Sequence, residues 1–345
     1  MLKAGQVGQR DWVLPLSAVA LGLVAFVWSL DLSLVWAHAQ AWLNPKSDMT
    51  AMVGGYEALL REPWRVPPTT VERLTSQPVS IVFTDSIPWL ALLLKASGAG
   101  ESINVLGLFL LLSYPLQALA MLAVLRAFGV RHPAVLLFGA ALALLHPPWL
   151  LRQFGHIALS GHWILLFGLA LAVTSLREGL TRRRIGAFAL LCALATGVHA
   201  YFLPPLAACL AAAGLSEIAQ RRPNAWRRAL GAGLASLAAV GVSAVVLGYG
   251  LGGARQGAEA LGVYGMNLLG PLLPVGSQVF GQVWTGRWFT GVTDPSGAQS
   301  FEGAQYLGAG ALALIGLAAF ASALALRRAP PVAALWCAGR PSSGS

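Results

Sequence analysis

The sequence predicts an all-α fold: a polytopic transmembrane helical bundle of about eight or nine spans. Two observations support this prediction. Hydrophobic residues make up 57% of the chain and charged residues only 10%, whereas a soluble globular chain carries about 25% charged residues. Several apolar runs also reach the roughly 20 residues that a helix needs to cross a bilayer. We expect a single domain over residues 1–345, and because residues 341–345 look like a truncated end, a longer native chain stays open.

The first apolar run, Trp12 to Trp36, is predicted to be a retained signal-anchor helix. It follows Lys3 and Arg10 and is longer than the apolar region of a cleaved signal peptide. We place this span at residues 13–36. The other expected spans are residues 103–125, 133–150, 160–176, 185–202, 203–219, 229–250 and 305–326, and a ninth begins near Pro331.

Charge bias decides whether the apolar run 79–97 also crosses the membrane. If it did, the Arg182–Arg184 and Arg221–Arg228 clusters would lie outside, although excess Lys and Arg normally lie in cytoplasmic loops. Asp85 and Pro88 also interrupt the run. We therefore predict an outer-face juxtamembrane or re-entrant helix here. The chain would be a multi-pass protein of the bacterial inner membrane, with a cytoplasmic N-terminus and a periplasmic active face.

In this topology the net charge of +10 belongs to inner loops. It does not indicate nucleic acid, because no basic run on a soluble segment is interleaved with aromatic residues. Two large outer segments, 37–102 and 251–304, remain. Most acidic residues and histidines fall on this outer face: Asp31, Asp48, Glu57, Glu62, Glu72, Asp85, Glu101, Glu259, Asp294, Glu302, His38, His146, His156, His162 and His199.

Asp48 is the candidate catalytic acid. It closes the stretch Asn44-Pro45-Lys46-Ser47-Asp48 and precedes an amphipathic helix over 50–61 whose apolar face can lie on the bilayer. A carboxylate at this boundary can accept a proton from an attacking hydroxyl. The alternative is that Ser47 or Asp48 caps the helix, and the two roles are compatible.

Asp85 and three histidines form the candidate metal or phosphate site. Asp85 lies in Thr84-Asp85-Ser86-Ile87-Pro88, which can also cap the following helix. His156, His162 and His199 are expected on the same face, and histidine with carboxylate suits Zn²⁺ or Mn²⁺. The alternative is a set of interfacial polar anchors.

The remaining candidates suit anions and sugars. Arg152 lies in an apolar neighbourhood, and its planar guanidinium suits a phosphate. Trp, Arg and small polar residues in the last outer loop suit a sugar ring, or else an interfacial aromatic belt. The sequence contains no nucleotide-binding or nucleophile-elbow motif, and the three cysteines lie in apolar runs without metal-like spacing.

The order of these features resembles the GT-C-type glycosyltransferases, membrane enzymes that use polyprenyl-phosphate sugars. The region 48–131 looks like the corresponding part of bacterial aminoarabinose and mannosyl transferases. The chain is also similar to an uncharacterised bacterial family of GT-C-like membrane proteins, through 84–88, Gly155-His156, His162-Trp163 and Glu302-Gly303. It departs from the GT-C pattern because Met49, not a second acid, follows Asp48, and because Asp85 precedes Ser-Ile-Pro, not Lys-Pro-Pro.

The resemblance implies sugar transfer from a polyprenyl-phosphate-linked donor to an acceptor hydroxyl at the outer face, with Asp48 as catalytic acid. Lys46, Arg152 and His162 would bind the donor phosphate, and Asp85, His156 and His199 a divalent metal (Mg²⁺, Mn²⁺ or Zn²⁺). The expected partners are the lipid-linked sugar, membrane lipid and a glycan, lipid or protein acceptor. The acceptor-binding candidates are Glu57, Trp64, Arg65, Trp288 and Glu302.

Two other functions stay open: a non-enzymatic lipid or polysaccharide transporter or flippase, and an O-antigen polymerase or ligase-like protein. A transporter is expected to hold charges near the bilayer midplane, whereas the spans predicted here are nearly free of charge. An O-antigen ligase-like protein is usually led by Arg and His in a large outer loop. Both comparisons favour an interfacial enzyme led by an acid.

Overall fold

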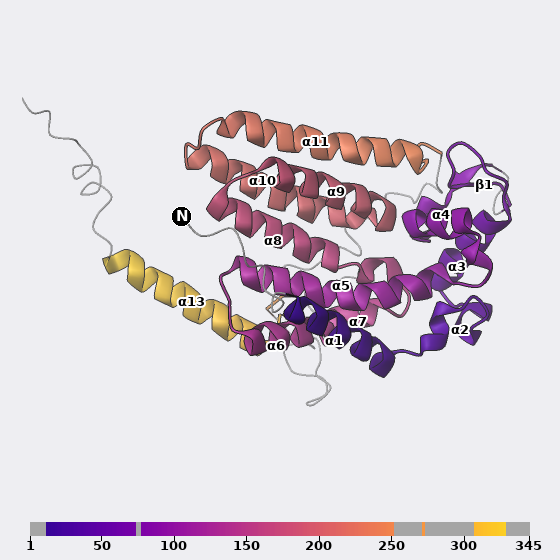
Figure 1. Ribbon diagram of the computed structural model, residues 1–345, viewed down its shortest axis with the longest axis horizontal. Helices are drawn as coiled ribbons and strands as arrows, with labels where there is room; N and C mark the ends of the chain where they lie inside the picture. The colour runs from indigo at the N-terminus through magenta and orange to yellow at the C-terminus, as the bar shows by residue number, and fades with distance from the viewer. Residues whose placement is uncertain (1–11, 74–76, 252–270, 273–306, 329–345) are drawn as a thin grey trace, which may run out of the picture. The chain divides into compact units, whose positions relative to one another are not determined.

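The computed structural model describes residues 12–73, 77–251, 271–272 and 307–328, and it is mostly helical (Figure 1). The chain divides into two compact units, Met1–Arg255 and Gln256–Ser345. In the second unit the described helix is α13 (Ala309–Arg328). The elements discussed below belong to the first unit.

Four helical stretches are long and apolar enough to cross a membrane: Val105–Ala127, Ile157–Glu178, Ala200–Ala219 and Ala225–Val246. They contain α5 (Val105–Ala127), α8 (Trp163–Glu178), α10 (Leu203–Ala219) and α11 (Ala225–Val246). The predicted all-α bundle with membrane-crossing helices is therefore confirmed at this level. The shorter helices at the other predicted spans are α1 (Val13–Ser29), α6 (Pro133–Leu144), α9 (Arg182–Val198) and α13.

α5 is the central helix of the first unit. It packs against α1, α6 and α8, while α9, α10 and α11 pack together on the other side of α8 (Figure 1). The contact between α1 and α5 is close enough to require glycine: a Cβ on Gly22 would lie 2.5 Å from the Cα of Pro115. The long helices thus form one bundle with a shared apolar core.

The run 79–97 does not form one spanning helix, as the charge argument predicted. It contains β2 (Val79–Ser80), a 3₁₀ turn η2 (Ile81–Thr84) and the ten-residue helix α4 (Pro88–Ser97). Ten residues of α-helix measure about 15 Å, roughly half the hydrocarbon thickness. The cause is local, because Asp85 and Ile87 both adopt positive φ angles that separate η2 from α4.

A small sheet ties this loop to the end of α11. β1 (Thr70–Val71) pairs antiparallel with β2, and Thr70 lies opposite Ser80. The hydroxyls of Thr69 and Ser80 lie 2.8 Å and 2.6 Å from the carbonyl oxygen of Leu247, just beyond α11. This clamp fixes the first large loop at one end of the bundle.

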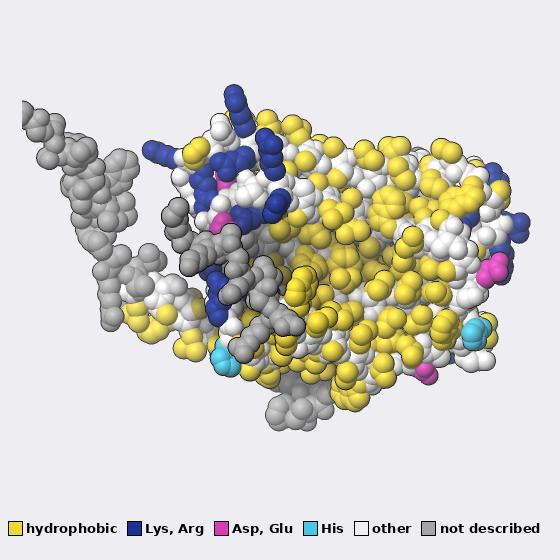
Figure 2. Space-filling view, in the orientation of Figure 1, with side chains coloured by type: hydrophobic (Ala, Val, Ile, Leu, Met, Phe, Trp, Pro, Cys, Tyr) yellow, Lys and Arg dark blue, Asp and Glu magenta, His cyan; other side chains and the backbone are white. Residues whose placement is uncertain are grey.

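The opposite end of the bundle carries a cluster of arginines, at the upper left of Figure 2. There the α8–α9 and α10–α11 connections meet around Glu217, whose carboxylate is buried. This carboxylate accepts the N–H of Leu180 at 2.6 Å and lies 3.7 Å from Arg222 and 3.5 Å from Arg228. We call this the basic end, formed by Arg177, Arg182, Arg183, Arg184, Arg221, Arg222, Arg227 and Arg228.

A second buried acid, Glu62, organises the loop that follows α3 (Asp48–Arg61). Its carboxylate accepts the backbone N–H groups of Glu72 and Arg73, both at 3.1 Å, and lies 3.4 Å from Nε of Arg65. The ammonium of Lys95 donates to the carbonyl oxygens of Leu59 and Glu62 at 2.8 Å, which joins α4 to the end of α3.

These hydrogen bonds predict an acid-dependent stability. The N–H of Glu72, above all, lowers the pKa of Glu62 below its ordinary value of 4.5. The Glu62 carboxyl therefore binds its proton more tightly in the unfolded chain than in the folded protein. Its contribution to the stability of the fold is complete above pH 4.5 and is lost as pH falls through the lowered pKa. We expect the melting temperature of Glu62→Gln to be lower than wild type at neutral pH, and the gap to close in acid.

Thermal melts of detergent-solubilised protein across this pH range measure the effect. Glu57→Gln, which changes an exposed acid of α3, is the control and is expected to show no such gap. A gap for Glu62→Gln that is independent of pH would contradict the prediction.

Candidate functional site

Asp48 and His156 form the first of two acid–histidine pairs. Oδ2 of Asp48 lies 3.4 Å from Nε2 of His156, and the two side chains are 58% and 38% exposed, so a ligand can reach both. Asp48 is the first residue of α3, where the helix dipole favours a negative charge. Ser47 precedes the helix at φ +54°, and its side chain makes no capping hydrogen bond.

The turn that carries His156 is anchored in the core. It follows α7 (Pro147–Arg152) and leads into the 3₁₀ turn η4 (Ile157–Ser160). The indole N–H of Trp149 donates to the carbonyl oxygen of Ser160 at 2.7 Å, and the Tyr114 hydroxyl donates to Gln153 at 3.0 Å. These buried contacts hold the segment on both sides of His156 and leave the imidazole at the surface.

Asp85 and His199 form the second pair, with Oδ1 of Asp85 3.4 Å from Nε2 of His199. The residues on either side of Asp85 anchor its turn to α3. The Ser86 hydroxyl donates to the carbonyl oxygen of Met52 at 2.7 Å and lies 2.7 Å from the Thr84 hydroxyl. Asp85 itself adopts φ +54°. Because both neighbours are anchored and Asp85 is left-handed, the Asp85 carboxylate contacts His199.

Backbone geometry assigns the proton of His199. Its Nδ1 accepts the N–H of Tyr201 at 3.2 Å, so the neutral ring carries its proton on Nε2, the nitrogen facing Asp85. Nearby, Tyr249 donates its hydroxyl to the carbonyl oxygen of Thr196 at 2.7 Å. Burial and then the negative charge of Asp85 raise the pKa of Tyr249 to about 12, which keeps the phenol protonated.

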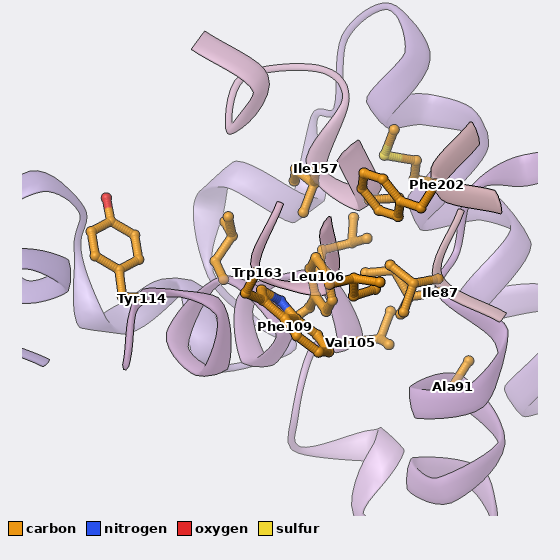
Figure 3. Packing of buried hydrophobic residues seen from close by; sticks show 14 of the residues in the cluster. Ile87, Ala91, Val105, Leu106, Phe109, Tyr114, Ile157, Trp163 and Phe202 are labelled. Carbon is orange, nitrogen blue, oxygen red and sulfur yellow. The ribbon is translucent and has the colours of Figure 1, made fainter. Parts of the chain in front are cut away.

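Phe202 links the second pair to His162. Its ring centroid lies 6.2 Å from that of His199 and 6.5 Å from that of His162. Phe202 belongs to the apolar core that Figure 3 shows with Ile157 and Trp163. Because His156 precedes Ile157 and His162 precedes Trp163, the same core places both histidines at one end of the bundle, opposite the basic end.

The structure divides the predicted metal ligands into two pairs. Asp85 meets His199, whereas His156 meets Asp48. Across residues 12–73, 77–251, 271–272 and 307–328, no group of three His, Cys, Asp or Glu residues is arranged to hold a metal ion. Because a catalytic zinc site normally uses three protein ligands, the described residues do not fit a resident metal of that kind.

The predicted phosphate-binding residues lie near the pairs. Lys46 is exposed two residues before Asp48, and Arg152 ends α7, four residues before His156. His162 is partly buried, within electrostatic reach of His146 and Arg152. Arg152 is therefore close enough for its charge to act on His162.

The predicted acceptor-binding residues of the first loop have partners within the loop. Glu57 lies 3.3 Å from Arg61, and Arg65 lies 2.8 Å from Glu72 and 3.4 Å from Glu62. The Lys95 ammonium lies 4.8 Å from the ring centroid of Trp64, which is 57% exposed. The two candidates of the last loop, Trp288 and Glu302, lie outside the described residues.

Tyr249 was not among the predicted site residues. It falls inside the predicted span 229–250, where an aromatic residue looks like an interfacial anchor. α11 ends at Val246, which places Tyr249 in the connection beside Asp85. The available signal was its position near the end of an apolar run, on the face that was predicted to carry chemistry.

The close contact of α3 with the Asp85 turn yields a paired test. A Cβ on Gly55 would lie 2.1 Å from Oγ1 of Thr84 and 2.6 Å from Oγ of Ser86, so the turn or the helix must shift. A Cβ on its neighbour Gly54 would meet nothing within 4 Å. We expect Gly55→Ala to destabilise the protein by about 1–3 kcal/mol and Gly54→Ala to stabilise it slightly.

Thermal unfolding of the two purified variants, side by side in one detergent, measures the difference. Equal melting temperatures for Gly54→Ala and Gly55→Ala would show that the turn is not packed on α3 in this way.

Comparison with known proteins gives a family. No curated protein and no solved structure is significantly similar to this chain. One family model, described as a domain of unknown function (DUF6311), matches residues 19–339, nearly the whole chain. The chain therefore belongs to the DUF6311 family.

Proposed function

We propose that this protein is a GT-C-type membrane glycosyltransferase that moves a sugar from a polyprenyl-phosphate donor to an acceptor hydroxyl. The observation that supports this function best is the accessible Asp48–His156 pair, 3.4 Å apart at the start of a surface helix. A lipid-phosphate donor holds its anomeric carbon at headgroup depth, where a base on a juxtamembrane helix can meet it. The resemblance of the region 48–131 to GT-C enzymes points to the same residue.

In the proposed reaction the acceptor oxygen attacks the anomeric carbon. Asp48 takes the hydroxyl proton as the new carbon–oxygen bond forms. The bond from the anomeric carbon to the phosphate oxygen breaks, and the polyprenyl phosphate leaves with the electron pair. His156 positions the Asp48 carboxylate through their contact at 3.4 Å.

The negative charge of the leaving phosphate needs donors. Lys46 lies two residues before Asp48 and Arg152 four residues before His156, and the charge of Arg152 acts on His162, so we assign the phosphate to these cations. The second pair adds an N–H: Nε2 of His199 carries its proton and can donate to Asp85 or to a phosphate oxygen. A divalent metal remains a proposal from the family resemblance, and none of these steps depends on it.

The proposed topology orients this site toward the periplasm. The basic end, where α10 connects to α11, lies at the opposite end of the bundle from α3 and α4 (Figure 1), and positive charge normally marks the cytoplasmic side. With a cytoplasmic N-terminus, the eight or nine crossings would alternate so that α3 and α4 lie on the outer surface of a bacterial inner membrane.

Two other functions compete with transfer: movement of a lipid-linked glycan without chemistry, and polymerisation or ligation led by Arg and His. A flippase would relocate the labelled donor and leave its sugar–phosphate bond intact. A ligase-like enzyme would depend on Arg152 and His162 and be insensitive to Asp48. The position of Asp48 beside His156 favours acid-led transfer.

For the proposed catalytic acid, we predict that Asp48→Asn lowers the rate of sugar transfer about 10²–10⁴-fold, because the amide cannot accept the proton. The assay uses purified full-length protein in liposomes with radiolabelled polyprenyl-phosphate sugars. Glu101→Gln, another exposed acid of the first loop, is the control and should retain wild-type activity. Wild-type transfer by a folded Asp48→Asn variant would refute the proposed role.

The second prediction concerns His156. If the pair acts as one unit, His156→Gln lowers kcat with little change in the donor KM, and the double variant with Asp48→Asn is no slower than Asp48→Asn alone. Losses that multiply in the double variant would mean that His156 acts independently of Asp48.

A further inference from the structure

An apolar groove runs between α10 and α11, from Leu203, next to Phe202, to Trp226 at the basic end. It has a volume of about 680 Å³. Small residues create it: Ala211 and Gly214 on α10 face Ala229 and Gly233 on α11, and the Cβ that Gly214 lacks would lie only 3.3 Å from that of Ala229. The groove is therefore narrow and mostly apolar, and its α10 lining runs from Leu203 to Ile218, about 24 Å of helix, which exceeds the roughly 15 Å of one hydrocarbon leaflet.

The two helices that form the groove face outward. Only 28% of the most apolar window of the α10 stretch and 17% of that of α11 are buried within the protein. Leu230, Leu234 and Leu237 line the groove and are exposed. In a membrane these surfaces contact lipid, so acyl chains are present at high concentration beside the groove.

The groove continues into a basic pocket of about 470 Å³. Ile218 and Trp226 line both spaces, and the pocket adds Arg221, Arg222 and Arg227. Trp226 is 67% exposed, in the position that tryptophan favours at the boundary between hydrocarbon and headgroups. Apolar and cationic surfaces thus meet end to end, as the two parts of a lipid do.

The arginines of this pocket have different partners. Arg222 donates to the backbone carbonyls of Leu176 and Arg177 and lies 3.7 Å from Glu217, so it holds the loop together. Within the described residues, no hydrogen bond or ion pair engages the guanidinium of Arg221 or Arg227. Two exposed cations beside a tryptophan offer a site for an anion.

From this arrangement we infer an anionic phospholipid site at the basic end. One acyl chain lies in the α10–α11 groove, and the phosphate lies against Arg221 and Arg227. The charge balance favours an anionic lipid: the described residues 177–228 contain the eight arginines of the basic end but only two acids, Glu178 and Glu217. Basic pockets between transmembrane helices on the cytoplasmic side of a membrane bind acidic headgroups, and this is the side proposed above for the basic end.

The headgroup test uses the full-length protein in mixed micelles. Native mass spectrometry follows binding of phosphatidylglycerol and of phosphatidylcholine with matched acyl chains. We expect phosphatidylglycerol to bind more tightly, and Arg221→Gln with Arg227→Gln to weaken that binding about 10- to 30-fold while leaving the weaker binding of phosphatidylcholine unchanged. Equal binding of the two lipids, or no effect of the arginine variants, would overturn the proposal.

The groove test uses two glycines of α11. Gly233 lines the groove, and a Cβ there meets nothing within 4 Å, so Gly233→Leu fills the groove without an internal clash. Gly241→Leu is the matched control, because Gly241 is equally open but does not line the groove. Both changes favour the helix. We expect Gly233→Leu to abolish the binding of phosphatidylglycerol and Gly241→Leu to leave that binding unchanged.

Undiminished lipid binding by Gly233→Leu would overturn the proposal. So would a protein dimer that Gly233→Leu dissociates, because a second copy of the chain, not lipid, would then occupy the groove. Sugar transfer is measured on the same samples, so a failure of the lipid-site proposal can be told apart from a failure of the proposed role of Asp48.

Discussion

The arrangement of the candidate site depends on burial of a few apolar side chains at the ends of helices. Ile87, Ile157 and Trp163 enter one core together with Phe202 (Figure 3). Each such side chain contributes about 1.5–3 kcal/mol when fully buried, whereas a surface ion pair contributes about 0–1 kcal/mol. The apolar residues therefore fix the chain, and the imidazole of His156, next to the buried Ile157, lies at the surface as a consequence.

Charge is separated along the bundle by the same construction. The connections at the basic end are short, and they are joined around the buried carboxylate of Glu217. At the other end, the long connections 30–104 and 145–162 carry Asp48, Asp85 and His156, whereas His199 lies in the short turn between α9 and α10. This separation follows from antiparallel helices, since alternate connections must fall at opposite ends. In the proposed function, one end would bind lipid headgroups and the other would carry out chemistry on a hydroxyl.

Much of the fold follows from hydrophobic pattern alone. Helices occur at each predicted span within the described residues, and Asp85 with Pro88 divides the run 79–97 as predicted. Boundaries were less accurate: α9 ends at Val198, before the predicted 202, because His199 adopts φ −162° and begins a new turn. The hydrophobic period of 3.6 residues indicates a helix, but it does not show at which residue the helix ends.

The pairing of the site residues was not predictable in this way. The sequence suggested that Asp85, His156 and His199 meet, but the structure pairs His156 with Asp48. Which histidine meets which acid depends on the left-handed conformation at Asp85 and on the turn that Trp149 and Gln153 anchor. These are tertiary effects of single residues, and no periodic pattern encodes them.

α11 connects the two ends of the bundle. Its 22 residues extend about 33 Å, from Trp226 near the lipid groove to the clamp of Thr69 and Ser80 on Leu247. Tyr249 follows two residues later, beside Asp85. The helix that lines the apolar groove at one end therefore also holds, at its other end, the first large loop and the tyrosine beside the Asp85 turn.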